Sequence, residues 1–163
     1  MLFSTKAEYG VCLMVELGRQ PSSAPVSLAA VANAERLPLS YLEHLVARLR
    51  KAGLVTSTRG AHGGYTLARP AAEIKMDEVV EALEGQIAPM ECFHEAPEGK
   101  VLCSHELLED HRGCATKLLW TRVQNGVNRA LSGTTLAELV EFGGPHVITP
   151  DEAVQTESVG TAV

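Results

Sequence analysis

The sequence predicts a mostly α-helical fold with one small β-hairpin and a long helix toward its C-terminal end. Apolar residues recur at helical spacing in several segments, and residues 6–17, 41–52 and 114–131 are the longest of them. A glycine-rich stretch at residues 59–64 separates two short runs of strand character, as at the tip of a hairpin. The 163 residues suffice for one domain with an appendage, and the hydrophobic content of 45% is typical of a globular protein.

The first helix is expected over residues 6–17, with Ser4 as its N-cap. Glu8 and Cys12 are four residues apart, so they lie together on a face away from the core. Val11 and Val15 also fall outside the core face. We therefore expect this helix to bury a second surface against a partner subunit. The core face itself carries Tyr9, Gly10, Leu13, Met14 and Leu17.

Two helices joined by a tight break follow, which is the pattern of a helix-turn-helix. The first is a short helix over residues 28–34 with Ser27 as its cap, and a proline breaks the chain after it. Ser40 can cap the second, longer helix over residues 41–52, which Gly53 ends. The side chains that this second helix turns inward are Leu42, Leu45, Val46 and Leu49.

The hairpin is expected to pair residues 54–57 with residues 65–67. Between them, residues 59–64 include three glycines, which permit positive backbone angles at a hairpin tip. A further amphipathic helix is expected over residues 76–84. A helix-turn-helix followed by such a hairpin is a winged helix, and we assign residues 1–84 to a winged helix-turn-helix DNA-binding domain.

The rest of the chain divides into three segments. Residues 85–113 have weak periodicity, and a loop of that length in a small protein is usually functional or disordered. Residues 114–142 are expected to form the long helix and a short return helix, and residues 143–163 a disordered tail. A small domain cannot easily bury the long helix alone, so we expect it to form a homodimer through its apolar stripe, Leu119, Val123, Val127 and Leu131.

Charge is divided unevenly along the chain. The net charge is −6, but residues 1–75 carry nine basic and five acidic residues, whereas residues 76–163 carry five and fifteen. A basic N-terminal half can face the phosphates of a nucleic acid. The sequence has no apolar run long enough to span a bilayer and no secretion signal, so we expect a cytoplasmic protein without a membrane partner, in which thiols stay reduced.

Three cysteines lie close together in and just after the weakly periodic segment. Ten residues separate Cys92 from Cys103 and Cys103 from Cys114, unlike the compact cysteine pairs of zinc ribbons. Several thiols in one irregular segment of a cytoplasmic protein indicate metal binding or redox chemistry, and thiolates suit iron–sulfur clusters and zinc alike. Three histidines of the segment could also bind metal but are more simply exposed polar residues, namely His94, His105 and His111.

In a winged helix, the second helix of the motif enters the major groove of DNA. Residues at its N-terminal end would meet base edges or phosphates, and a glutamate can accept a hydrogen bond from a cytosine amino group. The wing would meet phosphate or the minor groove. Solvated surface residues are the alternative interpretation, and winged helices also bind proteins. The candidate DNA-binding residues are Ser40, Tyr41, Glu43 and His44 on the helix and Arg59, Gly60 and His62 on the wing.

Several motifs together resemble one known family over about residues 1–142. They are LSYLEHLVARLRKAGLVTSTRGAHGGYTLARP, then an ALEG segment, three cysteines and a Leu-Trp pair, and they resemble the IscR/NsrR family of bacterial regulators. The resemblance implies a homodimer that binds palindromic operators in double-stranded DNA, with the helix after the cysteines as its interface. It also implies an iron–sulfur cluster on Cys92, Cys103 and Cys114. Metal-free members, such as the CymR type, lack this triad.

Two departures from the family leave the fourth ligand and the cluster type (2Fe–2S or 4Fe–4S) open. The family's triad is usually more tightly spaced, and Lys117 stands where IscR-like members place a histidine ligand. In other branches an acidic residue on the first helix of the partner subunit completes the cluster, and Glu8 matches that position. Cys12, one turn further along, is the alternative, and its thiolate would be the softer ligand.

The sequence therefore favours a repressor or activator whose operator affinity is controlled by an iron–sulfur cluster. The signal could be redox state, nitric oxide, or the supply of iron or clusters. The alternative is a zinc-stabilised or metal-free thiol-based DNA-binding regulator. We do not expect an enzyme, because the sequence contains no P-loop, GxSxG or HExxH motif.

Overall fold

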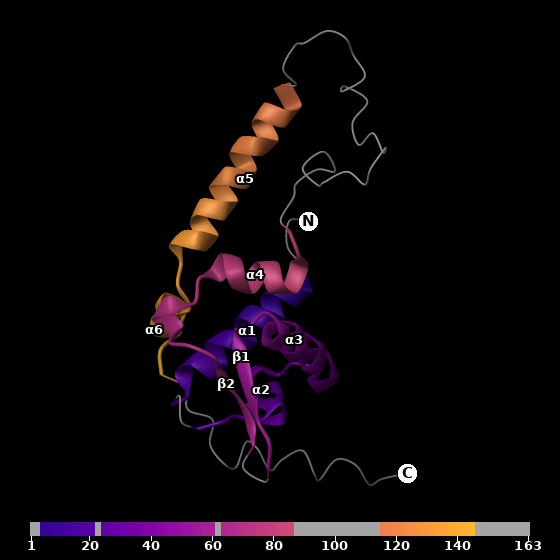
Figure 1. The fold of residues 1–163 in the computed structure, drawn as a ribbon, viewed down its shortest axis with the longest axis vertical. Coiled ribbons are helices and arrows are strands. Elements are labelled where there is room, and N and C mark those ends of the chain that lie inside the picture. Colours follow the sequence, from indigo (N-terminus) through magenta and orange to yellow (C-terminus); the bar gives the residue numbers. More distant parts are fainter. Residues whose placement is uncertain (1–3, 22–23, 61–62, 87–114, 146–163) are drawn as a thin grey trace.

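The computed structural model describes residues 4–21, 24–60, 63–86 and 115–145 (Figure 1). Most of the predicted loop and most of the predicted tail therefore lie outside the described residues. The elements in chain order are α1 (Thr5–Arg19), α2 (Leu28–Glu35), α3 (Leu39–Lys51), β1 (Val55–Thr58), β2 (Gly64–Leu67), the 3-10 helix η1 (Ala71–Glu73), α4 (Met76–Glu84), α5 (Ala115–Gly133) and α6 (Leu136–Gly143).

Side-chain caps start three of the described helices, and those of α1 and α2 are the ones that the sequence predicts. The hydroxyl of Ser4 accepts a hydrogen bond from the Lys6 amide at 3.2 Å, and that of Ser27 accepts one from the Ala30 amide at 3.1 Å. At the start of α6, the Thr135 hydroxyl accepts from a backbone amide at 3.3 Å. These caps hold α1, α2 and α6 at the predicted positions along the chain.

The prediction that Ser40 caps α3 is wrong. The helix begins two residues earlier, at Leu39, with Pro38 as its N-cap and no side-chain capping bond, so Ser40 is an exposed residue of the first turn. The carbonyl of Pro38 accepts from the amides of Tyr41 and Leu42 at 3.1 and 3.2 Å. The proline ring fixes φ near the value that this start requires, so the turn forms without a side-chain cap.

One apolar core is formed by residues of α1, α2, α3, α4, β1 and α6. Its largest members include Leu13 and Met14 of α1, which are fully buried. Tyr9 is only half-buried, and its ring meets that of Tyr41 edge-on with centroids 5.7 Å apart. The inward face predicted for α3 is confirmed, because Leu42, Leu45, Val46 and Leu49 are all at most 3% exposed.

The wing is an antiparallel pair in which Val55 faces Leu67 and Thr58 faces Gly64. It is also tied to the chain before α2, because the backbones of Val26 and Tyr65 exchange hydrogen bonds of 2.8 and 3.0 Å. A Cβ atom on Gly64 would lie 2.5 Å from the Val26 carbonyl oxygen. The positive φ predicted for the glycines of the tip is found at Gly60 but not at Gly64, where close backbone approach requires glycine.

Helix α5 extends away from the rest of the described chain (Figure 1). None of its residues is buried, and Leu118 and Leu119 are 58% and 57% exposed. Its C-terminal end is held where the Met76 amide donates to the Thr134 carbonyl at 3.0 Å and Leu136 enters the core. The predicted long helix and return helix are therefore both present. In the single chain, Leu119 of the apolar stripe is exposed, whereas Leu131 at its other end packs against the core.

A cluster of charged residues around Arg19 connects three helices. The carboxylate of Glu16 is completely buried and accepts from the Arg19 guanidinium at 3.0 Å and from the Gln20 amide at 2.8 Å. Arg19 also pairs with Glu35 of α2 at 3.6 Å and donates to the Gly143 carbonyl of α6 at 3.2 Å. The Arg19 side chain thus joins α1, α2 and α6.

We expect Arg19→Ala to lower the free energy of unfolding by about 2–3 kcal/mol, because a buried carboxylate loses its cation. The effect should fall below that of a fully broken pair, since Gln20 still donates to Glu16. Urea unfolding followed by circular dichroism measures the change. Arg122→Ala, at an exposed arginine of α5, is the matched control and should change stability by less than about 0.5 kcal/mol. Equal stability of the two variants would contradict this role of the cluster.

Candidate DNA-binding surface and metal-ligand face

The outward face of α3 presents most of the predicted DNA-binding residues. Glu43 and His44 are exposed near the start of the helix, together with Ser40. Tyr41 is half-buried against Tyr9, so its ring is held in place by α1 and does not extend freely into solvent. The polar residues of the first turns are therefore available to a partner molecule, whereas the opposite face of α3 is fixed in the core.

The wing presents Arg59 and Gly60, which are both exposed at the end of β1. His62, also predicted to bind DNA, lies outside the described residues. The helix and the wing are bonded to each other, because the Arg50 guanidinium donates to the Ser57 hydroxyl at 3.5 Å. This bond helps to fix the wing relative to the helix that it follows.

Two exposed arginines near the ends of α3 were not among the predicted DNA-binding residues. Arg36 lies in the turn between α2 and α3 with a left-handed φ of 53°, and Arg50 lies in the last turn of α3. The signal that could have found them is their residue type together with their place in the chain, in the turn before α3 and in its last turn. Both are of the residue type that binds DNA phosphates.

The predicted metal-ligand residues of α1 lie on one side of the helix. Glu8 is exposed and Cys12 is half-buried, and both line a groove of about 510 Å³ between α1, α4 and α5. The other lining residues are mostly apolar, and among them are Val11, Val80 and Leu131. The prediction that this face of α1 is separate from the core face is consistent with this arrangement.

Burial raises the pKa of the Cys12 thiol, and the nearby carboxylates of Glu35 and Glu8 raise it further. A metal that bound this sulfur would have to displace its proton. Glu8 has an exposed carboxylate at the same groove. Of the two candidates on this face, Glu8 is the more exposed.

Within the described residues, no group of three or more His, Cys, Asp or Glu side chains could hold a metal ion. The predicted ligands Cys92, Cys103 and Cys114 lie outside those residues, as do the three histidines of the same segment. Lys117 is exposed in the first turn of α5. At the groove on α1, the described chain places the Glu8 carboxylate and the Cys12 thiol, the two candidates for a single additional ligand.

In the described parts of the chain, no helix is both long and apolar enough to cross a membrane. A helix-turn-helix followed by an antiparallel hairpin is a winged helix. The chain belongs to the Rrf2 family, described as iron-dependent transcriptional regulators, which matches residues 3–142. It is thus a DNA-binding transcription regulator and not an enzyme, as the sequence predicts.

Several relatives have been characterised or solved. The chain is 37% identical over 142 residues to the transcriptional regulator CymR of Bacillus subtilis, over 87% of this chain and 91% of that protein. It is 35% identical to the regulator IscR of Cronobacter sakazakii, over 86% of this chain and 80% of the relative. The structure of CymR, the global cysteine regulator of B. subtilis, matches with a TM-score of 0.70 over 87% of this chain and 98% of CymR. That of T. potens IscR matches with a TM-score of 0.69 at 35% identity, over 88% and 89%.

Proposed function

We propose that this regulator binds a palindromic operator as a homodimer and that an iron–sulfur cluster controls its affinity for that operator. Cys92, Cys103 and Cys114 would bind the cluster, with Glu8 of a second copy as the fourth ligand. The observation that carries the proposal is the exposed Glu8 carboxylate at an open groove of α1, in a chain that also has the cysteine triad. Reduced cytoplasmic thiols would suit such a site.

The second copy is supported by α5. A helix with no buried residue and two leucines more than half exposed leaves apolar surface in water, which pairing with its own copy would remove. The groove that contains Glu8 is also lined by Leu131 of α5. A partner that covers α5 would therefore approach the same groove, where it could bring its cysteine segment to Glu8.

When bound, the cluster would supply iron that reacts with oxidants or nitric oxide. The carboxylate of Glu8 would hold one corner more weakly than a thiolate does, because oxygen is a harder ligand. A ligand on α1 would link the cluster to the helix that packs on the helix-turn-helix. That link gives two states with different contacts, as any control of DNA affinity requires.

A zinc-stabilised or metal-free thiol-based regulator is the second candidate, since CymR proteins are among the relatives at 37% identity. The colour of protein purified without oxygen separates the two candidates, because a cluster is brown or red and zinc is colourless. Iron and acid-labile sulfide in nearly equal molar amounts, together with the visible absorption of a cluster, would support the cluster. Colourless protein with zinc or without metal would contradict it.

For the DNA surface, we expect Arg59→Ala to weaken binding to all sequences and to reduce the salt slope by about one, if the contact is to a phosphate. Glu43→Ala should instead relax the preference at one base pair of each half-site, with a discrimination loss of about 1–3 kcal/mol. Operator selection followed by binding at several salt concentrations measures both effects.

Two exposed residues outside α3 and the wing serve as matched controls for these variants. They are Lys75 for the basic change and Glu73 for the acidic one, and their alanine variants should bind like the parent. If Arg59→Ala and Glu43→Ala also bind a selected operator like the parent, the assignment of α3 and the wing to the DNA is wrong.

A further inference from the structure

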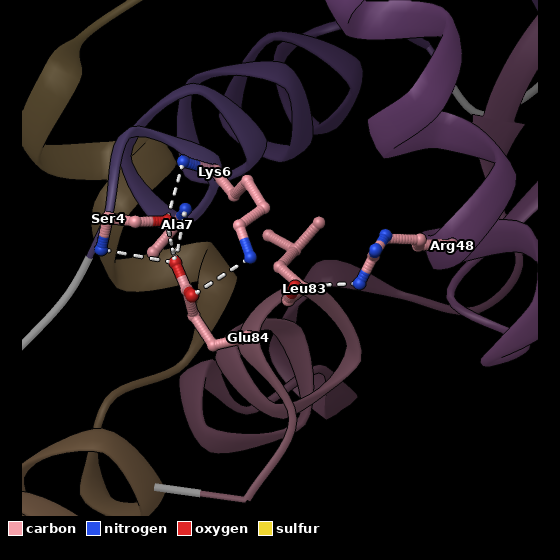
Figure 2. Close-up of polar contacts among 6 residues, drawn as sticks. All are labelled: Ser4, Lys6, Ala7, Arg48, Leu83 and Glu84. Atoms are coloured by element: carbon pink, nitrogen blue, oxygen red, sulfur yellow. Dashed lines mark hydrogen bonds and ion pairs between the residues drawn. The ribbon is translucent and has the colours of Figure 1, made fainter.

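The last turn of α4 carries a carboxylate that caps the start of α1 (Figure 2). Glu84 Oε1 accepts hydrogen bonds from the amides of Ser4 and Ala7 at 3.1 and 3.2 Å, and also from the Ser4 hydroxyl. Its second oxygen pairs with Lys6 Nζ at 3.4 Å. The first amides of a helix have no partner within it, so Glu84 satisfies α1 from a position 80 residues along the chain.

Burial alone would raise the pKa of Glu84, but the hydrogen bonds from Ser4 and the charge of Lys6 hold it below its usual value. The side chain is therefore ionised at neutral pH. In that state it fixes the turn of α1 that leads directly to Glu8, whose amide donates to the Ser4 carbonyl at 3.4 Å.

The same turn of α4 is bonded to α3. The carbonyl of Leu83 accepts a hydrogen bond from the Arg48 guanidinium at 3.1 Å (Figure 2). Carbonyls in the last turn of a helix lack partners within it, so a side chain from another helix can take one. Arg48 lies four residues after His44, one turn along the helix whose first turns present the candidate base contacts.

Apolar packing also holds the last turn of α4 in place. The Leu83 side chain is fully buried against Gly10, and a Cβ atom on Gly10 would overlap it. Gly85 then ends α4 with a φ of 82°, and the chain continues into the segment that contains Cys92. A displacement of the last turn of α4 would therefore displace the start of α1 and the adjacent part of α3 together.

We propose that the last turn of α4 couples the start of α1, where Glu8 lies, to α3, with Glu84 and Arg48 as positioning residues. The proposal rests on the proposed function for the signal that reaches Glu8. Glu84 lies eight residues before Cys92 and contacts Ala7, the neighbour of Glu8. Glu84 thus lies in the chain between the cysteine segment and the chain's own Glu8, which in the proposed dimer would bind the partner's cluster, and Arg48 extends the connection to α3. Such a contiguous set of contacts can carry coupling between two sites.

The first test compares operator affinity with and without cluster for the parent, Glu84→Gln and Arg48→Met. The Glu84→Gln side chain would keep an acceptor for the α1 amides but lose the pairing with Lys6, and methionine would keep the apolar stem of arginine. We expect each variant to reduce the ratio of the two affinities by about fivefold or more, the usual lower range of coupling between sites. Because a lost phosphate contact would lower both affinities equally, the ratio isolates the coupling. Glu81→Gln, an exposed residue one turn earlier, is the control and should keep the parent ratio.

The second test needs no cluster. Amide hydrogen exchange of the metal-free Glu84→Gln protein should be faster over residues 5–10 of α1 and also over residues 39–46 of α3. Faster exchange confined to α1 would make Glu84 a local cap and would overturn the coupling, as would variants with the parent's affinity ratio. A parent ratio of one with the expected exchange in both helices would instead overturn control by the cluster and leave the coupling in place.

Discussion

Replacing any one of Cys92, Cys103 and Cys114 by alanine should abolish the visible absorption of protein purified without oxygen. Each thiolate would hold a corner of the cluster, and the loss of one would open iron to solvent and oxygen. Bound iron and acid-labile sulfide should fall to background in all three variants, while circular dichroism keeps the helical signal of the described domain. A variant that retains the parent spectrum would remove that cysteine from the ligand set.

The fourth ligand is tested by Glu8→Ala and Cys12→Ala made in the same way. We expect Glu8→Ala to alter the spectrum and to shorten the lifetime of the cluster in air, because an exposed carboxylate donor is lost. Cys12→Ala is the matched comparison on the same face, and its effect should be smaller, since the Cys12 side chain is half-buried whereas the Glu8 carboxylate is exposed. Loss of the cluster in Cys12→Ala alone would select the thiol as the ligand.

If neither α1 variant matters, the fourth ligand lies within the cysteine segment itself. The candidates there are His94, His105 and His111. Single alanine variants of these histidines would then identify the ligand by the same change of spectrum.

The double variant Leu119→Glu/Val123→Glu should be a monomer at micromolar concentration. Charges placed on the exposed apolar side of α5 cannot be buried against a second copy without a large desolvation cost. Because two linked half-site contacts gain about 10²–10⁴ in avidity, operator affinity should fall by a factor in that range. Sedimentation velocity and binding to a full palindrome measure the two effects.

Asn125→Glu is the control for this dimer test. Asn125 is an exposed polar residue on another side of α5, so a charge there should leave the parent's sedimentation unchanged. A double variant that sediments like the parent, or a parent that is already monomeric, would contradict the interface.

Local signals predicted most of the fold. Three helices begin at a capping hydroxyl that is followed directly by apolar residues at helical spacing, so the cap and the spacing both lie within a few residues of sequence. The caps are Ser4, Ser27 and Thr135. The start of α3 was misplaced because a proline carbonyl begins that helix while a nearby serine offers a plausible cap. The exposure of Glu43, His44 and Arg59 was predictable for the same reason, since it follows from the helical and hairpin periods.

Contacts between distant segments were not predictable from the sequence. Nothing near Glu84 indicates that it caps a helix 80 residues earlier, and nothing near Gly64 indicates the backbone of Val26 beside it. The buried Glu16 likewise resembles a surface residue until the packing of α2 and α6 is known. Each depends on how separate elements meet, which periodicity and capping do not encode.

The two backbone hydrogen bonds between Val26 and Tyr65 have a consequence for the operators that this regulator could use. They attach the wing to the chain that leads into α2, and the hydrogen bond from Arg50 to Ser57 attaches it to α3. The wing and the helix-turn-helix should therefore move as one unit. In the proposed complex, the number of base pairs between the bases contacted by α3 and the phosphates contacted by the wing would then be constant. Switching would change only the separation and the angle between the two winged-helix domains of the proposed dimer. Alternative operators should therefore differ in the spacer at their centre, while the length of each half-site stays the same.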